Sequence, residues 1–195
     1  MTYRPLNLRA EEVRAIRDGR KTMLRRIVKL SDPTQTYAAF AEDGWPMTED
    51  DRGYWSRDPC PFGTVGDRLW CRETWAENYS GIHGAQIHYR ADLPDDRGAA
   101  LTANHAFGLM EWRSPVTMPR WASRLTLEIV GVRVERLNSI SEADAIADGG
   151  WQYSDCPIHK NPIESFARHW NQINGPGSWD ENPFVWVLSF LRVSE

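Results

Sequence analysis

Lys21, Arg25 and Arg26 stand within six residues of one another in the segment GRKTMLRR, residues 19–26, which also contains Arg20. A lysine ammonium can hold a phosphate or a developing oxyanion, and an arginine can bind a phosphate through two hydrogen bonds. Most such side chains are simply exposed to solvent. In a regular strand Lys21 and Arg26 would face opposite ways, so either the strand begins after Lys21 or the two residues have different roles. We expect Lys21 in a ligand pocket and Arg26 as a structural support or a phosphate contact.

Asp148 is the candidate partner of Lys21. It ends a predicted helix just before Gly149 and Gly150, where a carboxylate opposes the helix dipole. An acid at this place is either an ordinary exposed residue or a sign of a nearby cation. Because a carboxylate paired with a lysine is suited to proton transfer, we take Lys21 and Asp148 as the candidate catalytic pair.

A second candidate site lies in MPRWASR, residues 118–124. Trp121 stands between Arg120 and Arg124 there, and interleaved rings and cations suit base stacking beside phosphate contacts. The alternative is that Trp121 packs against the end of a barrel. We expect these three residues to bind a nucleic acid or nucleoside.

The other tryptophans divide between core and surface. In VGDRLWCRET, residues 65–74, strand alternation places Trp70 and Arg72 on the face opposite the apolar residues, so Trp70 is a candidate for a second surface and Arg72 for a nucleic-acid contact. Trp186 lies in a segment that is apolar on both faces and should be core. Trp45 and Trp55 fall in a polar insertion and could cover a pocket.

The cysteines give a weak indication of a metal site. Cys60, Cys71 and the Cys156-x-x-His159 pair could form a Cys3His zinc site, although packing is the more usual fate of such cysteines. The chain contains no nucleophile-elbow, P-loop or dinucleotide-binding motif. We predict neither a metal nor a cofactor.

The elements that must position these residues can be read from periodicity. Strand patterns occupy residues 4–8, 21–29, 65–74, 87–92, 124–137 and 184–193, and helix patterns occupy 10–18, 141–148 and 163–173. The apolar phase of the segment 124–137 switches near Gly131, which predicts a bulge or bend of the kind that turns a barrel corner. The expected fold is α+β, a small mixed barrel with short flanking helices.

Composition limits the function classes. The chain has 195 residues, a formal net charge of −4 and a pI near 5.8, which predict one domain without a basic nucleic-acid coat. Residues 32–58 and 76–111 read as insertions. Three cysteines do not suggest a disulfide scaffold, and no apolar run suggests a signal peptide or membrane span, so we expect a cytoplasmic protein of a bacterium or a phage-infected cell.

Several of these segments resemble one family. Gly19-x-Lys21-x-x-x-x-Arg26 is similar to the signature of ASCH domains, which have a PUA-like barrel fold. The resemblance extends, in the order seen in phage and prophage members, to GDRLWCRETW, MPRWASRLTLEIVGVRVERL, ISEADAIADGG and PFVWVLSFLRV at residues 66–75, 118–137, 140–150 and 183–193. With residues 4–29, these segments cover roughly half of the chain.

The resemblance implies a pocket for nucleic acid or a nucleoside. Some small members look like N4-acetylcytidine amidohydrolases, whose pocket uses a lysine, a threonine and an acid. The lysine matches Lys21 and the acid falls at Asp148, but the threonine position falls on Leu24, which cannot act as a nucleophile. Thr22 could replace it only if the strand register shifts.

Three functions follow as hypotheses. The first is an ASCH-like pocket that binds single-stranded RNA, DNA or a modified nucleoside, and Leu24 favours it. The second is an amidohydrolase of N4-acylated cytidine or a related amide. The third is a phage accessory protein whose insertions bind a protein partner.

Overall fold

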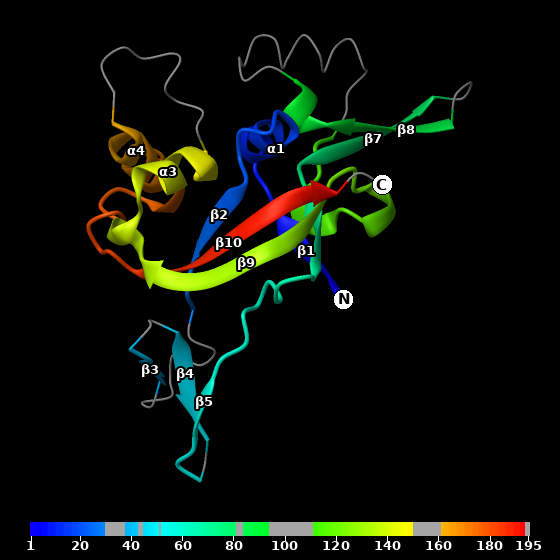
Figure 1. The fold of residues 1–195 in the computed structure, drawn as a ribbon. Helices are drawn as coiled ribbons and strands as arrows, with labels where there is room; N and C mark the ends of the chain where they lie inside the picture. The colour runs from blue at the N-terminus through cyan, green and yellow to red at the C-terminus, as the bar shows by residue number, and fades with distance from the viewer. Residues whose placement is uncertain are drawn as a thin grey trace.

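The main element of the fold is a mixed five-stranded sheet (Figure 1). The computed structural model describes residues 1–29, 38–42, 45–50, 52–80, 84–93, 111–149 and 161–193. The sheet has the order β1-β6-β9-β10-β2, with bounds Tyr3–Asn7, Arg68–Arg72, Thr126–Arg136, Phe184–Val193 and Met23–Ile27. β1 runs parallel to β6, and the other neighbours pair antiparallel.

β10 is an interior strand, paired with β9 and β2, and is covered on both faces, as its apolar sequence predicts. Trp186, Leu188 and Phe190 belong to the larger core, together with Val13 and Ile16 of α1 (Ala10–Arg17). The alternate residues Val185 and Val187 belong to a second core with Trp170 of α4 (Pro162–Asn174). Since the side chains of a strand alternate between faces, one strand supports a core on each side of the sheet.

The predicted irregularity of the long strand is present in β9. The register passes from Ser189 opposite Gly131 to Phe190 opposite Ile129, so Val130 is an extra residue without a partner in β10. Val130 is half exposed, whereas Ile129 on one side and Val134 on the other are buried. The bulge therefore moves the apolar phase from odd to even residues.

The helices begin and end where their sequences indicate. α3 (Glu142–Asp148) is capped by Ser141, whose Oγ accepts a hydrogen bond of 3.1 Å from the Asp144 backbone. After α1, Gly19 has φ +73°, in the left-handed region that favours glycine, and the chain then turns into β2. This turn sets the position of Lys21.

The two predicted insertions contain strands rather than only loops. In the first, β3 (Ala38–Phe40), β4 (Pro46–Glu49) and β5 (Trp55–Arg57) form a separate antiparallel sheet, which Figure 1 shows at the opposite end of the molecule from α1. In the second, β7 (Trp75–Ser80) pairs with β8 (Gly84–Tyr89), and the short helix η1 (Arg90–Asp92) follows. Residues 87–92 were expected to be one strand, so that prediction is correct only for the end of β8. Residues 94–110 of this insertion lie outside the described residues.

The α+β class is thus confirmed. Within the described residues β1 and β2 are the two edges of the sheet, and no strand pairing closes it into a barrel. None of the described helices has the length and apolar character needed to cross a membrane.

Candidate functional site

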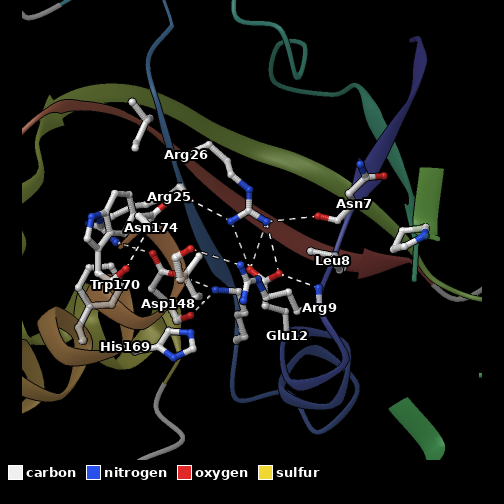
Figure 2. A pocket seen from close by; sticks show the side chains of 15 residues that line it. Asn7, Leu8, Arg9, Glu12, Arg25, Arg26, Asp148, His169, Trp170 and Asn174 are labelled. Carbon is white, nitrogen blue, oxygen red and sulfur yellow. Dashed lines mark hydrogen bonds and ion pairs between the residues drawn. The ribbon is translucent and has the colours of Figure 1, made fainter. Parts of the chain in front are cut away.

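A cavity of about 310 Å³ opens at the β2 edge of the sheet, between the start of α1 and the side of α4 (Figure 2). It is of the size that binds small molecules. Four of its wall residues are cations and two are acids, and aromatic rings of α4 complete it. The lining residues are Asn7, Leu8, Arg9, Glu12, Lys21, Arg25, Arg26, Ile27, Pro115, Asp148, Phe166, His169, Trp170, Ile173 and Asn174.

Lys21 and Asp148 form a buried ion pair in the wall of this cavity. The Lys21 ammonium donates hydrogen bonds to Asp148 Oδ1 and to the Asp148 carbonyl oxygen. Only 3% of the Lys21 side chain and 4% of the Asp148 side chain are exposed, which decides against two solvated surface charges. The predicted pairing is therefore present, while the catalytic roles stay predictions.

Lys21 can share a cavity with Arg26 because β2 begins only at Met23. The backbone N–H groups of Arg20 and Lys21 both donate to the carbonyl of Ala15, at 2.8 and 3.0 Å. This tight turn after α1 places Lys21 outside the alternation of the strand. Of the two possibilities left open by the sequence, the structure has the one in which the strand starts after Lys21.

Arg25 lies behind the pair and holds Asp148 in place. Its side chain has no exposed surface, and it donates to Asp148 Oδ2 at 3.0 Å, Glu135 Oε1 at 2.7 Å and Asp144 Oδ2 at 3.0 Å. Burial alone would lower the pKa of Arg25, but Asp148 and Glu135 outweigh it and raise the pKa. Asp148 therefore has a cation on each carboxylate oxygen.

Arg26 is held by Glu12 of α1 and reaches the opposite edge of the sheet (Figure 2). Its guanidinium lies 3.2 Å from Glu12 Oε1 and donates to the Asn7 carbonyl of β1 at 3.3 Å. Burial alone would raise the pKa of Glu12, but Arg26, Lys21 and the Arg9 backbone N–H together lower it. Arg26 thus contacts Glu12 and Asn7, and which of its two expected roles it has stays a prediction.

Two buried donors of the cavity wall have no hydrogen-bond partner among the described residues. They are Arg25 Nε and Trp170 Nε1. A buried donor left unpaired costs about 1–3 kcal/mol, so such atoms call for water or a ligand. Burial first and the charge of Lys21 second lower the pKa of His169 to about 4, which leaves this wall residue neutral at pH 7.

Sequence reasoning gave Arg25 no role of its own and missed Glu12 and the α4 residues of the wall. A signal existed for Glu12, because it stands beside Val13 and four positions before Ile16 on the buried side of α1. Nothing in the sequence distinguishes Arg25 from an exposed strand residue. The α4 residues are found only once α4 is placed against β10.

Leu24 and Thr22 both lie outside the cavity wall. Leu24 is 1% exposed and belongs to the larger core, so a hydroxyl at this position would face the core and not the ligand. Thr22 is exposed, and its backbone pairs with Ala147 and Phe190. Thr22 is therefore not among the residues that line the cavity, and a catalytic role for it stays a prediction.

The remaining candidates gather on another surface. Trp121 and Arg120 lie in the short helix η3 (Arg120–Ala122) and line a separate hollow with Trp70. Arg72 stacks on Trp70, 5.5 Å from its ring centroid. Arg124 is already neutralised, by Glu73 at 2.8 Å and by Asp92 at 2.6 Å.

The residues considered for other roles are placed differently. Trp45 does not cover the cavity, because it packs edge-on against Trp186 with ring centroids 5.0 Å apart. Cys60 and Cys71 are buried free thiols of the core, and burial raises the pKa of each. The described residues hold no cluster of three or more metal-binding side chains, and Cys156 and His159 lie outside them.

Comparison of the chain with family models, with curated proteins and with solved structures gives no match. The resemblance to ASCH domains accordingly stays a prediction, and function has to be argued from the chemistry of the site.

Proposed function

We propose that the cavity beside Lys21 binds a nucleoside or a single modified base. The observation that carries the proposal is the convergence on this one cavity of Lys21 and the aromatic residues Phe166 and Trp170. Bases offer carbonyl and ring-nitrogen acceptors in a flat aromatic frame, which such a wall complements. A volume of about 310 Å³ suits one base or nucleoside better than a stretch of polymer.

The resemblance to ASCH domains supports the same proposal. The matched lysine and acid are the pair found in the cavity wall. We further propose that the five-stranded sheet is a PUA-like barrel in which a side chain replaces the closing strand pair. In support, Arg26 of β2 donates to the Asn7 carbonyl of β1, at the two edges of the sheet.

Calorimetric titration with cytidine, N4-acetylcytidine and uridine tests the proposal. We expect at least one of these ligands to bind the wild-type protein, and Lys21→Met to weaken its binding roughly 10- to 100-fold, because a charge-assisted hydrogen bond is lost. Lys29→Met is the matched control, since Lys29 is an exposed lysine just after β2.

Absence of binding by every nucleoside would contradict the proposal. So would equal binding by the Lys21→Met variant, once circular dichroism has shown that this variant is folded.

A hydrolase acting on an N4-acylated cytidine or a similar amide is the second candidate. The specific observation that favours it is that Lys21, Asp148 and neutral His169 line the same cavity. Water would attack the amide carbonyl while Lys21 stabilises the oxyanion. Asp148 would take the proton from that water and pass it to the leaving amine, which gives a carboxylic acid and an amine.

Chromatographic detection of cytidine released from N4-acetylcytidine separates the two candidates. Turnover that is lost in both Lys21→Met and Asp148→Asn would support the hydrolase. Binding without turnover would leave the binding function alone. Leu24→Thr is not a suitable gain-of-function test, because it places a hydroxyl in the core.

A further inference from the structure

The outer face of the β1–β6 pair carries a ladder of rings and arginines. Tyr3 lies opposite Arg68, Pro5 opposite Trp70, and Asn7 opposite Arg72 in the parallel register. Of the intervening residues, Leu6, Leu69 and Cys71 point inward and belong to the core, whereas Arg4 at the edge is exposed. The ladder therefore faces away from the core.

The helix η3 adds the most exposed ring of this face. The Trp121 side chain is 68% exposed, which is unusual for tryptophan, and Arg120 stacks on Tyr3 at 4.1 Å from the ring centroid. Trp70, Arg120, Trp121, Ser123 and Thr126 enclose a shallow hollow of about 540 Å³. We call this hollow, with Tyr3 and Arg72, the Trp70–Trp121 surface.

The charges of this surface are not balanced by acids. Among the described residues, no carboxylate lies within ion-pair distance of Arg72 or Arg120; their contacts are with rings, an amide and a carbonyl. By contrast, the neighbours Arg68 and Arg124 both have carboxylate partners. In a chain of net charge −4, two uncompensated arginines beside exposed rings form a local cationic patch.

Arg72 connects this surface to the cavity. Its Nε donates to Asn7 Oδ1 at 2.8 Å, and its Nη1 donates to the Val116 carbonyl at 3.1 Å. Asn7 and Pro115 are wall residues of the cavity, and Trp70 under Arg72 is a wall residue of the hollow. The Asn7–Arg72 hydrogen bond thus joins a wall residue of the cavity to a residue of the Trp70–Trp121 surface.

We propose that the Trp70–Trp121 surface binds a single-stranded polynucleotide, with bases on Trp70 and Trp121 and phosphates on Arg72 and Arg120. Rings interleaved with unpaired cations match the alternation of bases and phosphates in a single strand, and a duplex offers no unstacked bases. The binding of the strand does not depend on the proposed function. The additional inference, that the base held in the cavity belongs to such a strand, does rest on the proposed function.

Fluorescence anisotropy with labelled single strands tests the proposal. Suitable probes are a uridine oligomer and a thymidine oligomer, each about eight nucleotides long, which is within the size that one strand-binding fold covers. We expect Trp121→Ala to weaken binding roughly tenfold, because one stacked base is lost. The control is Trp55→Ala, which removes another exposed tryptophan, from β5.

The arginines are tested by salt dependence. Removing one phosphate contact lowers the slope of log affinity against log salt concentration by about 0.7 for a single strand. We expect this change for Arg120→Gln and no change for Arg52→Gln, since Arg52 is an exposed arginine in the β4–β5 turn. The RNA and DNA probes show which sugar the surface prefers.

The outcomes separate this inference from the proposed function. If no oligomer binds, or if Trp121→Ala and Arg120→Gln bind like the wild type, the surface is not a strand site, whatever the nucleosides do. If Lys21→Met loses the nucleoside but keeps the uridine oligomer, both sites stand. If oligomers bind but no nucleoside does, the strand site stands and the cavity proposal fails.

Discussion

Asp148 receives Lys21 on one carboxylate oxygen and Arg25 on the other, so two buried cations depend on one acid. Removing a partner from a buried pair is costly because the remaining charge is left in a poorly solvated place. We expect Asp148→Asn to lower the free energy of unfolding by about 3–5 kcal/mol. Lys21→Met should cost less, about 1.5–3 kcal/mol, because Asp148 keeps Arg25.

Urea unfolding of the two variants measures this difference. If Lys21→Met were the more destabilising change, Asp148 would not be the acid on which both buried cations depend. Lys29→Met, at an exposed position, should leave the free energy of unfolding within about 0.5 kcal/mol of the wild type.

His169 gives a pH-dependent prediction. Its pKa is about 4 in the folded protein against 6.5 for an ordinary histidine, so the unfolded chain takes up the proton first as the pH falls. Its contribution to stability is complete above about pH 6.5, decreases as the pH falls toward about 4, and changes no further below that. We expect the free energy of unfolding of His169→Gln to lack this decrease between about pH 6.5 and about pH 4.

Nuclear magnetic resonance titration of His169 tests the cause of the shift. In Lys21→Met the pKa should rise from about 4 but stay below 6.5, because burial is the larger cause and the Lys21 charge the second. An unchanged pKa would show that Lys21 does not act on His169.

At the residue scale, the sequence predicted Asp148 because its position is unfavourable for a helix. An acid in the last turn of α3 opposes the helix dipole, and that conflict pointed to a cation, which the structure shows to be Lys21. Neither Arg25 nor Trp170 stands at a position that is unfavourable for its strand or helix. Their place in the cavity wall depends on tertiary packing, which periodicity cannot supply.

At the scale of elements, the turn after α1 decides where Lys21 points. Gly19 has φ +73° and open space around its α carbon, so a methyl group there meets no atom but strains the backbone. We expect Gly19→Ala to cost about 1–2 kcal/mol in thermal unfolding. Gly19→Asn should cost less, because asparagine enters the left-handed region more readily. Equal losses in the two variants would show that this conformation is not the cause.

The main elements were predictable from patterns that depend on burial. The alternation in β6, the two-sided apolar run of β10 and the phase change in β9 each reflect which face is covered. The strands β3, β4 and β5 were read as a polar insertion. They have only three or four residues each, too few for alternation to show.

At the scale of the molecule, the small β3–β5 sheet is joined to the main core through Trp45. This half-buried ring packs on Trp186, and its Nε1 donates to the Asp58 carbonyl at 2.8 Å. We expect Trp45→Ala to cost about 2 kcal/mol in urea unfolding, less than for a fully buried tryptophan. Trp55→Ala, at a more exposed ring of β5, should cost no more than about 0.5 kcal/mol. Similar losses in both variants would contradict this role of Trp45.

The position of β10 has a consequence for the order in which the strands join the sheet during folding. Among the described strands, β2 pairs only with β10. Lys21, just before β2, also has its partner Asp148 127 positions further along the chain. During synthesis the early β2 segment must therefore wait for residues 184–193 before it joins the sheet. If the cavity binds a nucleoside as proposed, that binding should appear only after β10 has paired with β2.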